Sequence, residues 1–251
     1  MEVHHHSHHP KKWKEYITEF FMLFLAVTLG FLAENLREHQ VVIERKNQNI
    51  EAMVTDLKKD SVSIAELTTM YTTGIQNLED MSYASLQYQN NKISKKEYLT
   101  YMVNMLDTLR IGLGFFQNNS AYKNLISTGG LSVIKSTAIK KLISEYYEAF
   151  GIKLLDNNRL LDVDGNEFFN RTSIFGYGYD KDTSIIKVRL SHQETLNDFI
   201  TNTDFEKSIT NPSFRMYTYK FIGRCGYFSY LLSTCKQMNE QLLKEFEKKE
   251  Y

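Results

Sequence analysis

The sequence predicts an all-α protein in which a single N-terminal transmembrane helix continues into the first long helix of an extramembrane helical bundle. Three observations lead to this fold class. A charge-free apolar run, FFMLFLAVTLGFLA, extends from Phe20 to Ala33. A seven-residue repeat of apolar residues begins inside this run and continues beyond it. Neither Pro nor Gly then occurs before Gly74, so no residue that breaks helices interrupts the repeat.

Residues 1–12 form a His-rich tail. Ser7 and Pro10 interrupt the histidines, which favours native sequence over a purification tag. A flexible cluster of this kind would bind Ni, Zn or Cu adventitiously, but no nearby carboxylate or cysteine completes a metal site, and we expect no cofactor. The histidines concerned are His4, His5, His6, His8 and His9.

Residues 13–35 are expected to span the membrane. The charge-free run alone is about 21 Å long, whereas extending the helix from Trp13 to Asn35 gives about 33 Å, enough for a bilayer core of about 30 Å. Lysines and aromatic residues around Trp13 are typical of an interfacial anchor. Possible signal-peptide cleavage sites are poor, and the repeat starts inside the run, so we expect an uncleaved anchor.

The lysines before the span predict its orientation. Lys11, Lys12 and Lys14 lie close together on a short tail, and the positive-inside rule then places the N-terminus in the cytoplasm. We therefore expect an inner-membrane protein whose C-terminal domain lies in the periplasm of a Gram-negative cell.

One face of the span carries Glu19, Ala26, Gly30 and Ala33. Small residues four apart let helix backbones approach closely in lipid, and a carboxyl group is costly where it faces lipid. This face is therefore a candidate for transmembrane association. The alternative, that Glu19 reaches the headgroup region, stays open.

The seven-residue repeat predicts a long first helix over 36–75. A second heptad position is mostly polar near the membrane, with His39, Lys46 and Asp60, so a strict two-stranded coiled coil is not expected. The seam should instead pack into a wider bundle or be only partly buried near the anchor. Its members are Leu36, Ile43, Ile50, Leu57, Ile64 and Tyr71.

The remainder of 36–251 is expected to complete the bundle. A second helix is predicted over 75–89, and Ser94 with Glu97 is a capping box that begins another. Ser136 is expected to cap a helix. Pro212 is suited to the first position of a last long helix over 212–249.

Residues 160–190 are the least regular part of the sequence. DVDGNE, from Asp162 to Glu167, is interpreted as a turn, with a partial calcium loop as the minor alternative. Gly176 and Gly178 between aromatic residues indicate a loop, and IIKVRL indicates a short strand or extended edge. A further capping box is predicted at 191–194.

Composition narrows the function. The 30 basic and 30 acidic residues cancel, which disfavours nucleic-acid binding. Cys225 and Cys235 would lie about 15 Å apart on one helix, too far for a disulfide, so free thiols are expected. Nucleotide-binding, metalloprotease and hydrolase motifs are absent from the sequence, and we expect no enzymatic activity and no catalytic residue.

Several segments together resemble a known group of proteins. LGFLAENLRE at the end of the span, then EAMVTDLKKDS, AYKNLISTGGLSVIKS and LISEYYE, occur in this order. The order resembles an uncharacterised family of small single-pass inner-membrane proteins common in Bacteroidota, and the resemblance covers about the first 170 residues. The family implies a membrane anchor but no activity or site residue.

Three hypotheses for function remain. The first is a membrane-anchored bundle that contacts the lipid bilayer and forms a homo-oligomer or docks on an envelope protein. The second is a ligand-sensing ectodomain that needs a partner for output. The third is a small oligomeric pore lined by Glu19 and Glu34.

Overall fold

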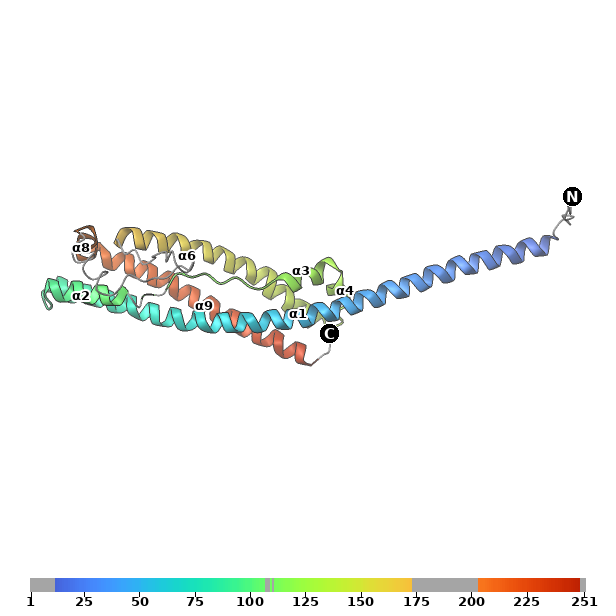
Figure 1. Cartoon of the computed structure of the whole chain (residues 1–251), viewed down its shortest axis with the longest axis horizontal. Coiled ribbons are helices and arrows are strands. Elements are labelled where there is room, and N and C mark those ends of the chain that lie inside the picture. Colours follow the sequence, from blue (N-terminus) through green and yellow to red (C-terminus); the bar gives the residue numbers. More distant parts are fainter. Residues whose placement is uncertain (1–11, 107–108, 110, 173–202, 249–251) are drawn as a thin grey trace, which may run out of the picture.

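The computed structural model describes residues 12–106, 109, 111–172 and 203–248. These residues are helical or irregular, with no β-strand among them, which confirms the all-α class. Figure 1 shows a long rod-shaped bundle from which one helix projects far beyond the rest. The elements in chain order are α1 (Trp13–Gln89), α2 (Lys95–Leu106), α3 (Ser120–Ser127), α4 (Gly130–Val133), α5 (Thr137–Ser144), the π-helix η1 (Glu145–Phe150), α6 (Gly151–Thr172), α8 (Thr203–Thr210) and α9 (Ser213–Glu247).

Helix α1 is one continuous helix of 77 residues. The expected end near residue 75 and the separate helix over 75–89 are therefore wrong. Gly74 lies inside the helix and is buried. A glycine in a helix interior costs about 1 kcal/mol relative to alanine, a penalty that packing against other elements offsets here.

Helix α9 runs antiparallel to α1 along most of the bundle (Figure 1). The rings of Tyr71 and Phe228 lie 4.9 Å apart, and the hydroxyl of Ser61 donates to Asn239 Oδ1 at 2.7 Å. The expected final helix over 212–249 corresponds to α9, whose N-terminal cap is Pro212. Antiparallel packing places the end of α9 beside α1 near the start of the bundle.

The third rod consists of α5, η1 and α6, which follow one another without a gap. The hydroxyl of Ser136 accepts a hydrogen bond from the backbone N–H of Ile139, which confirms the predicted cap. DVDGNE lies within α6, so neither a turn nor a calcium loop forms there. Its Gly165 packs near the ring of Phe221, and its Asp164 pairs with Arg224 at 2.5 Å.

An extended segment over 111–119 fills the space between the rods. Ile111 and Phe115 are buried in the core. Asn158 of α6 accepts from the N–H of Phe115 at 3.2 Å and donates to its carbonyl at 2.7 Å, as a neighbouring strand would. The Tyr71 hydroxyl donates to the carbonyl of Leu113. Side chains therefore satisfy backbone groups that would otherwise be buried without partners.

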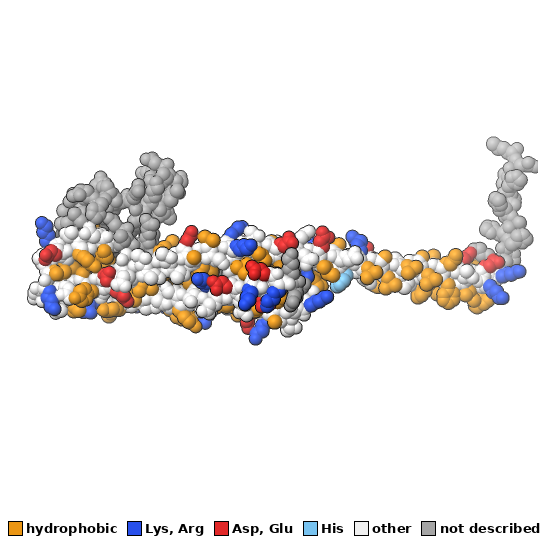
Figure 2. All heavy atoms as spheres, turned by 90° about the horizontal axis from the view of Figure 1, so that it is seen from below, with side chains coloured by type: hydrophobic (Ala, Val, Ile, Leu, Met, Phe, Trp, Pro, Cys, Tyr) orange, Lys and Arg blue, Asp and Glu red, His pale blue; other side chains and the backbone are white. Residues whose placement is uncertain are grey.

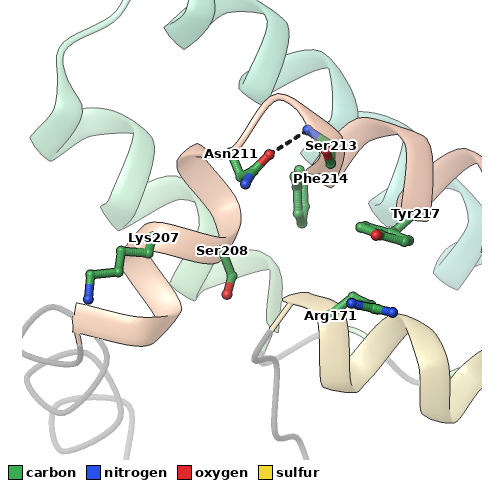
Figure 3. A pocket seen from close by; sticks show the side chains of 7 residues that line it. All are labelled: Arg171, Lys207, Ser208, Asn211, Ser213, Phe214 and Tyr217. Atoms are coloured by element: carbon green, nitrogen blue, oxygen red, sulfur yellow. Dashed lines mark hydrogen bonds between the residues drawn. The ribbon is translucent and has the colours of Figure 1, made fainter.

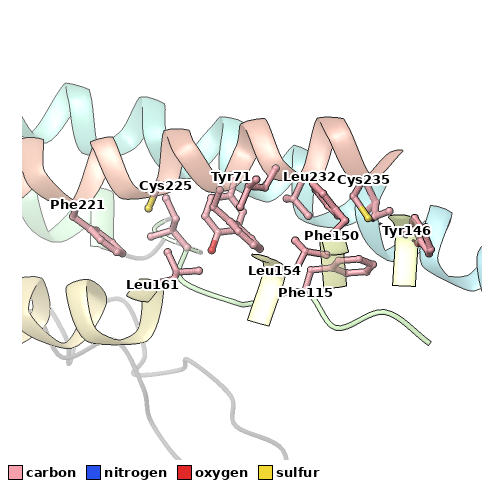
Figure 4. Packing of buried hydrophobic residues seen from close by; sticks show 14 of the residues in the cluster. Tyr71, Phe115, Tyr146, Phe150, Leu154, Leu161, Phe221, Cys225, Leu232 and Cys235 are labelled. Atoms are coloured by element: carbon pink, nitrogen blue, oxygen red, sulfur yellow. Dashed lines mark hydrogen bonds between the residues drawn. The ribbon is translucent and has the colours of Figure 1, made fainter. Parts of the chain in front are cut away.

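Figure 4 shows how these rods share one core. Tyr71 from α1, Phe115 from the extended segment, Leu161 from α6 and Leu232 from α9 belong to one cluster, and all four are buried. Because every rod contributes to this cluster, the described residues between Lys46 and Glu247 form one packed unit.

The two ends of the bundle are closed by short elements. At the end near the anchor, α3 and α4 pack on α1, and a Cβ on Gly130 would lie 3.4 Å from the Lys46 backbone. At the other end, the Ser94 and Glu97 capping box forms as predicted. There α2 meets α8, where the Tyr98 hydroxyl donates to the carbonyl of Ile209.

Candidate functional site

The N-terminal part of α1 is the longest exposed apolar surface of the described chain. One helix is long and apolar enough to cross a membrane, and none of its most apolar 18-residue window is buried. Figure 2 shows hydrophobic side chains along the visible face of this projecting part, with charged residues at its outer end. The span predicted over 13–35 therefore lies where a bilayer has access to it from all sides.

The structure leaves the predicted association face uncovered by the rest of the chain. Ala26, Gly30 and Ala33 are exposed, and a Cβ on Gly30 would have no neighbour within 4 Å. Glu19 is exposed on the same face. Another helix could approach the backbone closely at this face.

The predicted seam divides into a covered and an uncovered part. Ile50, Leu57, Ile64 and Tyr71 have no exposed surface, because the bundle of the same chain packs on them. Closer to the membrane, the exposed fractions are 66% for Leu36 and 36% for Ile43. The α1 helix of a second copy could contact the seam only at Leu36 and Ile43, because α9 and α3 of the same chain pack on the seam from Ile50 onward.

A buried carboxylate, Asp60, lies on the covered part of α1. Its Oδ1 accepts from the backbone N–H and the side-chain Nδ2 of Asn118, at 3.1 and 2.6 Å. Its Oδ2 accepts from the hydroxyl of Tyr146 at 3.1 Å. Asp60 thus joins α1 to the extended segment and to η1 at one point.

Asn239 of α9 completes this buried network. Its Nδ2 donates to the carbonyl of Leu57 at 2.9 Å and to the Tyr146 hydroxyl at 3.3 Å, while its Oδ1 accepts from Ser61. The Cys235 thiol lies 3.8 Å from the same hydroxyl. Asn239 Nδ2 donates to the Tyr146 hydroxyl, which in turn donates to Asp60 Oδ2. The network therefore fixes how α9 and η1 sit against α1.

Burial controls the protonation of these groups. It raises the pKa of Asp60, while the hydrogen bonds from Asn118 and Tyr146 act in the opposite direction. Burial also raises the pKa of the Tyr146 hydroxyl, and it raises the pKa of the Cys235 thiol to about 12. Asp60, Tyr146 and Asn239 have no exposed surface. The network therefore lies inside the bundle, away from solvent.

The π-helix η1 presents the tyrosines of this region. Tyr146 points at Asp60, and the next residue, Tyr147, stacks on Tyr122 with the ring centroids 4.5 Å apart. Gln117 donates to the Tyr146 carbonyl, and the Tyr122 hydroxyl donates to Glu148. A π-helix has a wider turn than an α-helix, which allows both adjacent tyrosines to be buried.

A pocket of about 270 Å³ opens at the end of the bundle farthest from the anchor. Figure 3 shows that three elements meet around it: the last turn of α6, helix α8 and the first turns of α9. The residues that line it are Arg171, Lys207, Ser208, Asn211, Ser213, Phe214 and Tyr217.

A second depression, of about 340 Å³, differs in its charge. Asp164, Lys220 and Arg224 line it together with Gly223. Asp164 pairs with both cations, at 3.5 Å for Lys220 and 2.5 Å for Arg224. Lys220 also pairs with Glu167, so two carboxylates compensate the two cations, and the depression offers a ligand little electrostatic attraction.

The other residues singled out from the sequence are either buried thiols or lie outside the described residues. Cys225 and Cys235 are free thiols, both buried on α9 as expected. The histidine tail, the Gly176 to Gly178 loop, the IIKVRL strand and the 191–194 capping box lie outside the described residues. Within the described part, no group of three or more His, Cys, Asp or Glu side chains is placed to hold a metal ion.

Sequence reasoning missed both the Asp60 network and the pocket. A polar residue at a heptad position was the available signal for Asp60, but its partners Asn118, Tyr146 and Asn239 are distant in sequence. No protein-family model, curated protein or solved structure matches the chain. The resemblance to the Bacteroidota family therefore stays a prediction.

Proposed function

We propose that this protein is a single-pass membrane anchor with a rigid helical bundle, which acts by association with a second copy or with an envelope protein rather than by catalysis. The observation that carries the proposal is the exposure of α1 from Trp13 to Gln40. Monomeric soluble proteins rarely expose so large a contiguous apolar surface, whereas a bilayer or a partner helix covers it favourably.

The continuity of α1 supports a mechanical link between membrane and bundle. The same helix contains the span, the short exposed stretch after it and one complete rod of the bundle. No glycine or proline lies between Gly30 and Gly74 to act as a hinge. A tilt or rotation of the span would therefore be passed to the bundle, and contact between two spans would bring their bundles together.

The face formed by Glu19, Ala26, Gly30 and Ala33 is the proposed contact inside the membrane. The uncovered Leu36 and Ile43 would extend this contact just outside it. Because the bundle covers the seam from Ile50 onward, the proposed association is confined to the anchor and the short stretch that follows.

We place the protein in the inner membrane, with the N-terminus in the cytoplasm and the bundle in the periplasm. Lys12 and Lys14 precede the span, and the positive-inside rule supports this orientation. A cysteine introduced at exposed Thr72 should react in intact cells with a thiol reagent that crosses the outer but not the inner membrane. Reaction only after lysis would reverse the orientation.

Native mass in mild detergent tests the association. Wild-type protein should form a discrete oligomer, and the double variant Ala26→Leu with Gly30→Leu should shift it towards monomer, because the larger side chains hold the backbones apart. The matched control, Val27→Leu with Phe31→Leu, alters another face of the same helix and should leave the oligomer intact. A wild-type monomer would exclude self-association and leave an envelope partner as the form of the proposal to test.

The pore hypothesis has less support than the anchor. Glu34, one of its two proposed lining carboxylates, forms a two-bond contact with Arg37 of the same helix, which compensates its charge. The sensor hypothesis has a specific observation in its favour, the pocket at the far end of the bundle.

A further inference from the structure

We propose that the outer face of α9 is a contact surface between two copies of this chain that stand side by side in one membrane. This contact is separate from the one on α1, and it rests on the proposed anchoring, because anchors in one membrane hold the two bundles parallel. The surface is called the α9 stripe. Its members follow one another at alternating spacings of three and four residues: Met216, Tyr219, Gly223, Gly226, Tyr230, Ser233 and Gln237.

The α9 stripe is an exposed face without charge. Residues at these spacings lie on one side of a helix, and every member is exposed, while the buried residues of α9 lie on the other side. The side of a surface helix that faces away from the core normally carries charged residues. No charged residue occurs among the members of this stripe, which is about 32 Å long. Such depletion of charge together with tyrosine and methionine is typical of the centre of a protein interface.

The charged residues beside the α9 stripe are paired within the chain. Lys220 and Arg224 pair with Asp164 of α6. On the other flank, Lys236 pairs with Glu240. These charges border the stripe and are compensated, so they leave its uncharged surface intact.

The absence of charge favours a second copy as the occupant. In a parallel contact between two identical rods, each residue lies opposite its own counterpart, so an exposed charge meets a like charge. The outer face of α6 would bring together like charges at Asp156 and Arg159, which are both exposed. The outer face of α1 would do so at Lys58 and Glu66. Of these three faces, the α9 stripe is therefore the one suited to a parallel copy of itself.

Two glycines at the middle of the α9 stripe allow a close approach. A Cβ on Gly223 or Gly226 would have no neighbour within 4 Å. Glycine weakens a helix interior relative to alanine, and no contact within the described chain requires glycine at these positions. A second helix could approach the backbone closely there, because the distance between two helices depends on the side chains between them. Tyr219 and Tyr230 each lie four residues outside the glycine pair, so their rings would pack at both ends of the contact.

The two tyrosine rings are already held by neighbours on α9. The guanidinium carbon of Arg215 lies 5.7 Å from the centroid of the Tyr219 ring. The rings of Tyr227 and Tyr230 lie 6.3 Å apart. Side chains that are ordered before association lose less rotamer freedom when a partner covers them.

The size of the α9 stripe indicates a partner held in the same membrane. The exposed fractions are 60% for Met216, 53% for Tyr219 and 62% for Tyr230. Covering these side chains would bury roughly 300–400 Å² per copy, since a fully buried aromatic side chain removes 150–250 Å² from water. A stable complex between free proteins buries about 800 Å² per partner. The stripe alone is therefore small for a freely diffusing partner, whereas a shared membrane raises the effective concentration of a second copy.

Cysteine cross-linking of the full chain in its membranes tests the proposal. Ser233→Cys places a thiol on the α9 stripe, and Asn166→Cys places one on the exposed face of α6 as the matched control. A short bismaleimide should join two copies of Ser233→Cys and leave Asn166→Cys monomeric. The wild type should also stay monomeric, because Cys225 and Cys235 are buried.

An added charge then locates the contact. Gly226→Glu, combined with Ser233→Cys, should lower the cross-linked fraction about tenfold or more, because each new carboxylate would meet its counterpart. Asn170→Glu adds the same charge on exposed α6 and should leave cross-linking unchanged. Gly226→Glu should fold, since glutamate favours a helix more than glycine does and the site is open, and a thermal midpoint that does not fall verifies this.

Three results would overturn the proposal: no dimer from Ser233→Cys, an equal yield from Asn166→Cys, or a yield that Gly226→Glu leaves undiminished. Extraction of the membranes with alkaline carbonate is a separate readout of the anchor. Release of the protein would remove the premise of both proposals, whereas protein that is retained without cross-linking would contradict the α9 contact alone.

Discussion

Replacing Tyr146 by phenylalanine tests the buried network most directly. The change removes one hydroxyl and keeps the ring that packs beside Tyr147. Asp60 then loses the hydrogen bond that Tyr146 donates to its Oδ2, while Oδ1 keeps both contacts with Asn118. Asn239 keeps its bond to the carbonyl of Leu57 but loses its second acceptor.

The magnitude follows from these contacts. A hydrogen bond to a buried charged group contributes about 1.5–3 kcal/mol, and the lost Asn239 contact adds a smaller amount. We expect the free energy of unfolding to fall by about 2–3 kcal/mol for Tyr146→Phe. With a urea dependence of about 2–3 kcal/mol per molar, the unfolding midpoint should move by about 1 M.

The assay is urea unfolding of the full chain in detergent, followed by circular dichroism. Tyr230→Phe is the matched control, because its ring is 62% exposed and the change should stay within about 0.5 kcal/mol. A Tyr146→Phe midpoint equal to that of the wild type would refute the assigned role of the network. Additive effects of Tyr146→Phe and Asp60→Asn would refute the coupling between the two groups.

Three further outcomes follow from burial and packing. Burial raises the pKa of Asp60 in the folded protein, so the native state holds its proton more tightly than the unfolded chain does. The wild type should therefore lose stability relative to Asp60→Asn as the pH rises from below about 3.8 through the raised pKa. Urea unfolding measured across this pH range tests this. Burial raises the pKa values of Cys225 and Cys235, so neither thiol should react with a disulfide reagent until urea unfolds the chain, and rapid reaction of the native protein would contradict the packing. Gly130→Ala should lower the thermal midpoint because its Cβ would lie 2.7 Å from a side-chain carbon, whereas Gly223→Ala, with open space on α9, should raise stability by up to about 1 kcal/mol.

Local chemistry explains which elements the sequence predicted well. The Ser94 and Glu97 box and the Ser136 cap depend on groups three residues apart, and both form. The last helix, bounded by Pro212, needed only a cap and an apolar stripe. The apolar span is recognisable because its composition alone separates it from the rest.

The errors occurred where tertiary packing overrides a local signal. Gly74 suggested a helix end, and Gly165 within DVDGNE suggested a turn, yet both lie inside long helices. Both glycines are buried, and at Gly165 the ring of Phe221 lies 3.5 Å from the position that a Cβ would take. Packing outweighs a helix-propensity penalty of about 1 kcal/mol.

By itself, the sequence determined that the chain is helical, that its first helix begins in an apolar span, and that one stripe of this helix must be covered. These properties follow from the composition of the apolar span and from the seven-residue repeat, both of which can be read from residues close together in the sequence. Only the tertiary structure decided that the chain itself covers this stripe from Ile50 onward and leaves it exposed between the span and Ile50. It also decided that Asp60 meets Tyr146, because residues far apart in sequence become neighbours only when the rods pack.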